Sequence, residues 1–454
     1  MPCLPAQLRG RPAIVACDCG SHLNLAPGRG LTRDQIAVGE ASLWRYAAAL
    51  SLRGPPRVSL GEGWTPLVRR DWQGAGVCFK LESQMPTGSF KDRGTAVMIN
   101  HLLELGVGSI HEDSSGNAGA SIATYAAASG IPCRIYVPAS ASRGKLVQIT
   151  VSGADVRAIP GTRQAVTDAA LAAAGESFYA SHNWQPHFIE GTKTLAFELW
   201  EQLGFRIPDN ILVSTGYGSN ILGLDRGFDE LEKSGEIAAR PRLFAVQAKN
   251  CAAFAAAWAA GGDRFVPFAT APTVAEGIAA PKPVRVAEVL RALRRSKGGV
   301  VTVAEEDIAP ALAALGLVGL FVEPTAATAG AALAQLLREG TIGPDQTTVV
   351  VLTGSGLKTA RAGRRASRHR NRPVIEVRLC KPEDAASFSA LCASPNANRA
   401  CRPSRREPAW GRRPWELAAL RLRLSPFAAH GPPAVIGAAG GTPGPANGVL
   451  EAVG

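Results

Sequence analysis

The 454-residue sequence lacks any apolar run long enough to cross a membrane. Its longest apolar stretches, such as residues 252–260, fall well short of the roughly 18 residues that a membrane span needs. The first residues, MPCLPAQLRGRP, lack the hydrophobic region of a signal peptide. These absences predict a cytoplasmic protein without a membrane partner.

The sequence also lacks the paired cysteine pattern of a disulfide framework. Its nine cysteines are odd in number and scattered, which favours reduced intracellular thiols. Cys17 and Cys19 are spaced like half of a zinc ribbon, but such a site needs four ligands and Cys3 is the one further candidate nearby. We therefore expect no metal site, and residues 1–50 are expected to form an N-terminal segment with at most a degenerate remnant of such a ribbon.

The net charge of +12 is concentrated at the end of the sequence. Residues 361–454 contain 16 Lys/Arg and 6 Asp/Glu. A basic run of this kind is typical of a solvated tail, so we expect no specific nucleic-acid partner. Within this basic tail, residues 359–454, the segment 374–393 faintly resembles the opening of a GNAT-type acyltransferase, but no glycine-rich pyrophosphate loop follows. A working second enzyme is not expected there.

Between residues 77 and 354, short apolar runs alternate with longer helical stretches. The expected strands are VCFKLE, PCRIYVP, NILVST, RLFAVQA and TTVVVLTG. The expected helices cover residues 92–105, 118–129, 192–203, 221–233, 284–295 and 325–338. This alternation predicts an α/β protein with doubly wound, mostly parallel sheets, in which ligands bind beyond the carboxyl ends of the strands.

The motif PTGSFKDRG, residues 86–94, follows the first expected strand and opens a helix. A lysine between glycines at such a turn can be partly desolvated, which lowers its pKa and leaves a neutral amine that can attack an aldehyde. Lys91 is therefore the candidate nucleophile. A surface lysine at a helix start is the alternative interpretation of this motif taken alone.

Three further motifs lie at turns after strands. SSGNAG (114–119) and GYGSN (216–220) each open a helix, where backbone N–H groups favour carboxylate or phosphate ligands. TGSGLK (353–358) places a hydroxyl at the end of an apolar strand. Each motif alone is also compatible with an ordinary glycine-rich or capping turn.

The order and spacing of the four motifs resemble the pyridoxal-phosphate (PLP) enzymes of fold type II, the tryptophan synthase beta superfamily. LWRYAAAL, LGEGWTPLV, FIEGTKTLAFELWEQLG, TVAEGIA and FVEPTAATAG extend the similarity to threonine synthases over residues 43–358. The resemblance implies two doubly wound α/β domains with a basic C-terminal tail. It implies a large PLP-binding domain (51–93 and 188–358), a small substrate domain (94–187) and a homodimer.

The resemblance also implies roles for individual residues. Lys91 would be the catalytic residue and hold the cofactor as a Schiff base. The cofactor-binding residues would be Lys91, Asn117, Gly216, Tyr217, Gly218, Ser219, Asn220 and Thr353, and the substrate carboxylate would be bound by Ser114, Ser115 and Asn117. A hydroxyl at Thr353 cannot keep the pyridine nitrogen protonated, which fits elimination and replacement better than transamination.

The substrate is less clear because the sequence departs from the threonine synthase pattern. Phe188 stands where those enzymes carry an arginine for the substrate phosphate, and His182-Asn183 replaces their Asn-Ser pair. Tyr217 and Ala326 are further departures. We expect a PLP-dependent lyase acting on a phosphorylated or hydroxylated amino acid such as O-phosphohomoserine. The alternatives are a threonine/serine dehydratase, a diamino-acid ammonia-lyase and a PLP-binding protein without turnover.

Overall fold

The structure is a computed structural model that describes residues 22–141, 143–359, 419–421 and 435–437. The chain divides into two units, Met1–Ser367 and Arg368–Gly454. In the second unit, β11 (Ala419–Arg421) and β12 (Val435–Gly437) form an antiparallel pair. The cysteine-containing start, the acyltransferase-like segment 374–393 and the other residues of the basic tail after 359 lie outside the described residues.

The first unit contains a six-stranded sheet, the large sheet, in the order β1-β2-β10-β7-β8-β9. Its strands are β1 (Leu67–Trp72), β2 (Ala75–Lys80), β7 (Asn210–Ser214), β8 (Arg242–Ala248), β9 (Gly299–Val303) and β10 (Thr348–Val351). All neighbours pair in parallel except the edge strand β1, which forms an antiparallel hairpin with β2. The expectation of a mostly parallel sheet is therefore confirmed.

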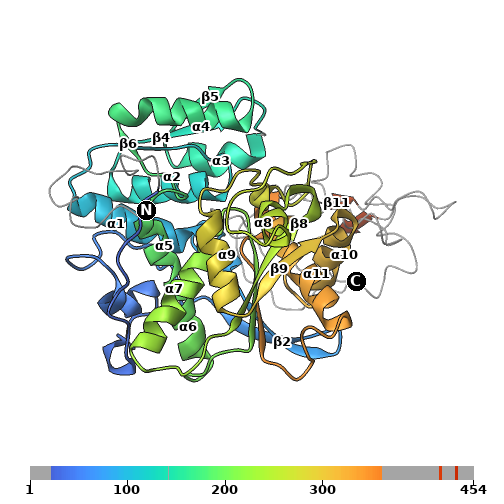
Figure 1. Cartoon of the computed structure of the whole chain (residues 1–454). Coiled ribbons are helices and arrows are strands. Elements are labelled where there is room, and N and C mark those ends of the chain that lie inside the picture. Colours follow the sequence, from blue (N-terminus) through green and yellow to red (C-terminus); the bar gives the residue numbers. More distant parts are fainter. Residues whose placement is uncertain (1–21, 142, 360–418, 422–434, 438–454) are drawn as a thin grey trace, which may run out of the picture. The chain divides into compact units, whose positions relative to one another are not determined.

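Helices cover both faces of the large sheet, as Figure 1 shows. Ile211 and Val213 of β7 pack on one face with α6 (Thr194–Gln202), α7 (Ser219–Lys233), α8 (Ala253–Ala259) and α9 (Val286–Arg295). Leu212, between them, packs on the other face with α10 (Glu305–Leu317) and α11 (Pro324–Arg338). Successive residues of a strand point to opposite faces, so a sheet covered on both sides needs this unbroken apolar run.

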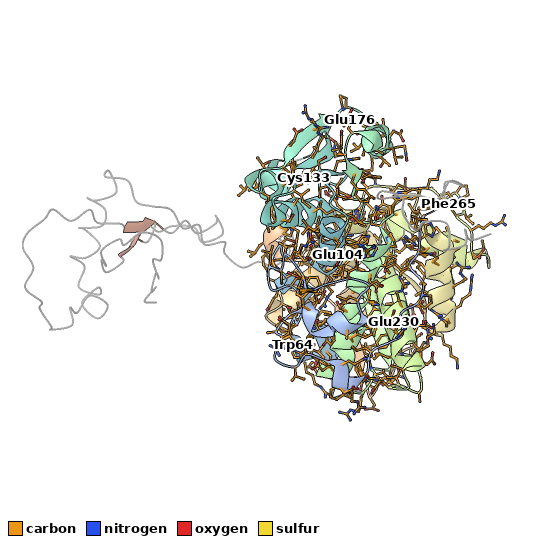
Figure 2. The ribbon with its side chains drawn as sticks, turned by 90° about the vertical axis from the view of Figure 1, so that its left-hand side faces the viewer. Trp64, Glu104, Cys133, Glu176, Glu230 and Phe265 are labelled. Atoms are coloured by element: carbon orange, nitrogen blue, oxygen red, sulfur yellow. The ribbon has the colours of Figure 1, made fainter. Side chains whose placement is uncertain are left out.

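A second, all-parallel sheet, the small sheet, has the order β5-β4-β3-β6. Its strands are β3 (Ile110–Glu112), β4 (Cys133–Pro138), β5 (Asp155–Ile159) and β6 (Phe178–Tyr179), and they all fall within the expected small domain. α1 (Lys91–Glu104), α2 (Asn117–Ser129) and α3 (Arg143–Val151) contribute to the apolar core on one face, and α4 (Arg163–Ala172) covers the other. In Figure 2, Cys133 and Glu176 lie with this sheet, whereas Trp64 and Glu230 lie in the part that holds the large sheet.

The helix expected over residues 192–203 corresponds to α6, and a further helix, α5 (Pro186–Thr192), precedes it. α5 begins at a proline, and α6 follows it directly after Lys193. Proline suits the first turn of a helix because its missing N–H would have no partner there, and this explains why α5 begins at Pro186. The domain boundary expected at residues 93/94 falls inside the first turn of α1, and the boundaries remain a prediction.

Candidate active site

Lys91 is the first residue of α1, at the turn that follows β2. Asp92 fixes this turn, because its carboxylate accepts hydrogen bonds from Thr87 N–H (2.7 Å) and from the hydroxyls of Thr87 and Ser121 (both 2.6 Å). Gly88 supplies the left-handed conformation that the turn needs, with φ at +79°. The lysine is thus held at a rigid helix start.

The environment of Lys91 is apolar with two acidic groups nearby. Its Nζ lies 4.8 Å from the ring centroid of Phe90 and 5.4 Å from that of Phe188. Burial lowers the pKa of Lys91 to about 8, and the negative charges of Glu112, in its ionised form, and of Glu323 oppose that shift. A sizeable fraction of the amine is therefore neutral near physiological pH, as the sequence-based argument for a nucleophile requires.

The end of β10 lies beside the lysine turn. Phe90 N–H donates to Thr353 O (3.0 Å), and Ser89 and Gly354 form a β-bridge. Thr353 is buried, and its Oγ1 has no hydrogen-bond partner within the described residues. A buried hydroxyl of this kind is a donor in need of an acceptor.

Asn117 begins α2 and faces the same region. Its Nδ2 donates to both carboxylate oxygens of Glu323, at 3.0 and 3.2 Å. Glu323 occupies the N-cap position of α11, and its backbone N–H donates to Gly354 O (3.0 Å), which links the start of α2 to the end of β10. Ser114 and Ser115 lie half-buried just before α2.

The glycine loop between β7 and α7 completes the arrangement. Gly218 has a φ of +92° at the N-cap of α7, and a Cβ at Gly216 would come within 3.0 Å of Ile278 Cα. Both side-chain polar atoms of Asn220 are buried without a partner in the described part of the chain. Tyr217 connects this loop to the lysine, because its ring lies 5.9 Å from that of His182, which is 5.7 Å from that of Phe188.

These residues fit pyridoxal phosphate. The open helix start at Ser219 and the unpartnered amide of Asn220 suit a phosphate dianion, and the Thr353 hydroxyl suits a ring nitrogen as its acceptor. Lys91 would hold the aldehyde carbon. When bound, the cofactor supplies an electron-withdrawing ring that stabilises negative charge at the substrate Cα.

Sequence reasoning missed four charged residues close to this site. Glu112 ends β3, directly before the SSGNAG motif, and Asp113 follows it. Arg163 of α4 donates to Asp113 (2.9 Å), and Glu323 binds Asn117. The sequence does show Glu112-Asp113 at a strand end and Glu323 in FVEPTAATAG, and both could have been noted as candidate site residues. Their partners could not have been identified, because they lie 50 or more residues away along the chain.

The described residues contain no group of three or more His, Cys, Asp or Glu side chains positioned to hold a metal ion. In the same part of the chain, no helix is long and apolar enough to cross a membrane.

Comparisons with known proteins agree with this site. Residues 58–354 match the family model described as pyridoxal-phosphate dependent enzyme. The threonine synthases of Methanocaldococcus jannaschii and Methanosarcina acetivorans are 34% and 35% identical, over 78% and 70% of this chain and 91% and 80% of theirs. A fungal L-serine ammonia-lyase from Rhizomucor miehei shares the fold with a TM-score of 0.59 at 21% identity, covering 67% of this chain and 97% of its own. The chain therefore belongs to the pyridoxal-phosphate-dependent enzymes of fold type II, as a lyase of the threonine synthase type.

Proposed function

We propose that this lyase eliminates water from a small hydroxy amino acid such as L-serine or L-threonine, and that its preferred substrate carries no phosphate. The observation that supports this is the side chain at position 188. Phe188 is fully buried beside Lys91, at the position where an arginine would pair with a substrate phosphate. An apolar ring cannot replace a bidentate, charge-assisted contact, which is worth about 1.5 to 3 kcal/mol, or roughly 10- to 150-fold in affinity.

Lys193, a cation five residues further along the chain, is already engaged. Lys193 is buried and donates to Glu190 (2.6 Å), and it forms an ion pair with Glu230 (2.9 Å). Burying an ammonium requires such partners, so Lys193 is part of the fold and not a free phosphate ligand. Lys193 is therefore not available to replace the missing arginine as a phosphate ligand.

O-Phosphohomoserine is a second candidate substrate, favoured by Arg163. This arginine pairs with Asp113 through Nη2, but its buried Nη1 has no partner within the described residues. The charge of Asp113 already compensates the guanidinium, so a phosphate would have to compete with a carboxylate. We therefore rank this substrate second.

Two assays on one preparation distinguish the two candidate functions. One measures keto-acid formation from L-serine and L-threonine, and the other measures phosphate release from O-phosphohomoserine. We expect keto acid with little phosphate release. Phe188→Arg should raise phosphate release by roughly 10-fold or more, because it restores the missing contact. Phe188→Leu is the matched control and should not. Efficient phosphate release by the unmodified protein would show that position 188 does not decide the substrate.

We also propose a cytoplasmic homodimer. Free thiols at Cys78, Cys133 and Cys251 support a reducing compartment, and the exposed side chains of Phe321 and Leu357 support a contact between copies. Sedimentation velocity should give twice the chain mass of 47.3 kDa. A monomer at micromolar concentration would contradict the dimer.

A further inference from the structure

A buried pair of side chains, Glu112 and His182, lies near Lys91, and beyond the electrostatic effect of Glu112 on Lys91 neither has been assigned a role. Glu112 Oε1 lies 2.8 Å from His182 Nδ1, and the backbone N–H of His182 donates to Glu112 Oε2 (3.2 Å). Both side chains are at most 5% exposed. The carboxylate therefore fixes the imidazole ring and the start of its loop together.

The loop that carries His182 is also held by the large-sheet part of the molecule. Arg285, buried at the start of α9, donates to the carbonyls of Asn183 and Trp184, both at 3.2 Å. Its other hydrogen bonds go to Glu288, to Asn24 Oδ1 and to Leu23 O, so it is itself fixed. The imidazole is thus positioned from two sides.

The His182 ring borders the reactive region. Its neighbours are the rings of Phe188 and Tyr217, in edge contacts of 5.7 and 5.9 Å between centroids. Lys91 Nζ lies 5.4 Å from the same Phe188 ring. In the described part of the chain, the one hydrogen bond of the ring is at Nδ1, which leaves Nε2 for another group.

The surroundings favour the uncharged forms of both members. Burial raises the pKa of Glu112 well above its usual value, and the charge of Asp113 adds to this, while Arg163 and Lys91 oppose it. Burial, with the positive charges of Lys91 and Arg163, lowers the pKa of His182 well below its usual value. A carboxylic acid beside a neutral imidazole can pass one proton along the pair.

We propose that Glu112 and His182 form a proton relay that protonates the leaving hydroxyl of the substrate. This inference rests on the proposed function, in which the substrate is a hydroxy amino acid. Position 182 is where the threonine synthase pattern has an amide for the phosphate, so the change from amide to imidazole accompanies the change from Arg to Phe at position 188. A phosphate leaves as a stable anion, whereas hydroxide is a poor leaving group and needs a proton.

The bond between Cβ and the hydroxyl oxygen breaks, and its electron pair stays on the oxygen. His182 Nε2–H gives its proton to that oxygen while Nδ1 takes the proton of Glu112, so water leaves and Glu112 becomes a carboxylate. Lys91 takes the proton from Cα and later releases it to solvent. Before the next turnover a solvent proton binds His182 Nε2 while the Nδ1 proton returns to Glu112, which restores the starting protonation of the pair.

The test compares two leaving groups. L-Serine needs a proton on its hydroxyl, whereas β-chloro-L-alanine loses chloride without one. His182→Asn should lower keto-acid formation from L-serine by about 10²- to 10⁴-fold, the range for loss of a general acid, and should affect chloroalanine much less. Equal losses on the two substrates would contradict the relay and assign His182 a structural role.

Two further variants sharpen the comparison. Glu112→Gln should give the same leaving-group pattern, and the double variant should be little worse than either single one because the two groups act as a unit. His111→Asn is the matched control. His111 is a second buried histidine and lies on β3, where its ring contacts Ser177 Oγ (2.6 Å) and Ala170 O (2.9 Å). Its replacement should lower the rates on L-serine and on β-chloro-L-alanine by the same factor.

A measurement without turnover tests the pair itself. In cofactor-free protein with ¹⁵N-labelled histidine, His182 should show a neutral imidazole at pH 7 with one ring nitrogen protonated. A doubly protonated ring at that pH would contradict the neutral relay.

The two proposals fail separately. Wild-type protein that releases phosphate from O-phosphohomoserine and forms no keto acid from L-serine would overturn the proposed function. Wild-type protein that is active on L-serine, with an unchanged ratio of serine to chloroalanine rates in His182→Asn, would overturn the relay alone.

Discussion

The ring of Phe188 lies directly against the backbone of Gly94. A Cβ at Gly94 would come within 2.6 Å of three atoms of that ring. This contact joins α5 to α1, three residues after Lys91, so the residue that replaces the expected arginine also fixes the helix that begins at the nucleophile.

Gly94→Ala should therefore destabilise the protein. Overpacking a filled site costs about 1–3 kcal/mol, and the displaced ring should also weaken cofactor capture by Lys91. Urea denaturation of the cofactor-free protein measures the first effect. Gly108→Ala is the matched control, because a Cβ there meets nothing within 4 Å. Equal stability of the two variants would show that Phe188 moves aside without cost.

The rate of cofactor capture should depend on pH through Lys91. Burial depresses the pKa of this amine to about 8 from its usual value of 10.5, so the ammonium form is disfavoured in the folded state and the reactive neutral form accumulates as the pH rises through 8. Stopped-flow absorbance after mixing cofactor-free protein with pyridoxal phosphate should show a rate that rises from pH 6.5 and levels off near pH 9. A rate still rising steeply at pH 10 would indicate an ordinary, exposed lysine.

Glu323→Gln should shift the pH midpoint of the cofactor-capture rate to a lower value. The negative charge of Glu323 is one of the two that raise the pKa of Lys91 against the effect of burial, and the variant removes it. The same stopped-flow series on the variant measures the shift. A midpoint displaced to higher pH would contradict the assigned electrostatics.

Lys193→Met should lower stability without changing substrate preference. Removing one member of a buried ion pair costs about 3–5 kcal/mol because the partner charges stay buried, here Glu190 and Glu230. Lys233→Met is a control at an exposed pair with Asp229 and should cost about 1 kcal/mol or less. A Lys193→Met protein of normal stability that had lost affinity for O-phosphohomoserine would instead make this lysine a phosphate ligand.

Deleting residues 361–454 should leave cofactor binding and elimination activity nearly unchanged, since the four motifs end at Lys358. Absorbance of the bound cofactor and steady-state rates on the truncated protein test this expectation. Loss of the cofactor or of the dimer would make the tail part of the working enzyme, whereas loss of salt-dependent adsorption alone would not.

Much of the fold could be predicted because local sequence determines it. β2, β4, β7, β8 and β10 coincide with expected apolar runs to within two or three residues at each end, since strands buried on both faces need continuous apolar residues. Of the strands in the two sheets, β1, β3, β5, β6 and β9 had not been predicted. β3 and β6 have only three and two residues, too few to show any periodicity, and β1, β5 and β9 lack a continuous run of buried residues.

The site was predictable to a lesser extent. The place of Lys91 at a strand-to-helix turn follows from the glycines around it, and the glycine loop before α7 follows from its own sequence. The contact between Glu112 and His182 joins residues 70 positions apart, and that between Asn117 and Glu323 joins residues 206 apart. The first pair depends on the pairing of β3 with β6, and the second depends on how the two sheets are placed; no local pattern contains either.

The most direct test of the whole account is to locate the cofactor. Protein saturated with pyridoxal phosphate is reduced with borohydride, digested and mapped by mass spectrometry. We predict a single phosphopyridoxyl group on Lys91, and a Lys91→Ala protein that folds with the same denaturation midpoint but carries no label and has no elimination activity. A label on any other lysine, or none in a saturated sample, would contradict the assignment of Lys91 and of the site built around it.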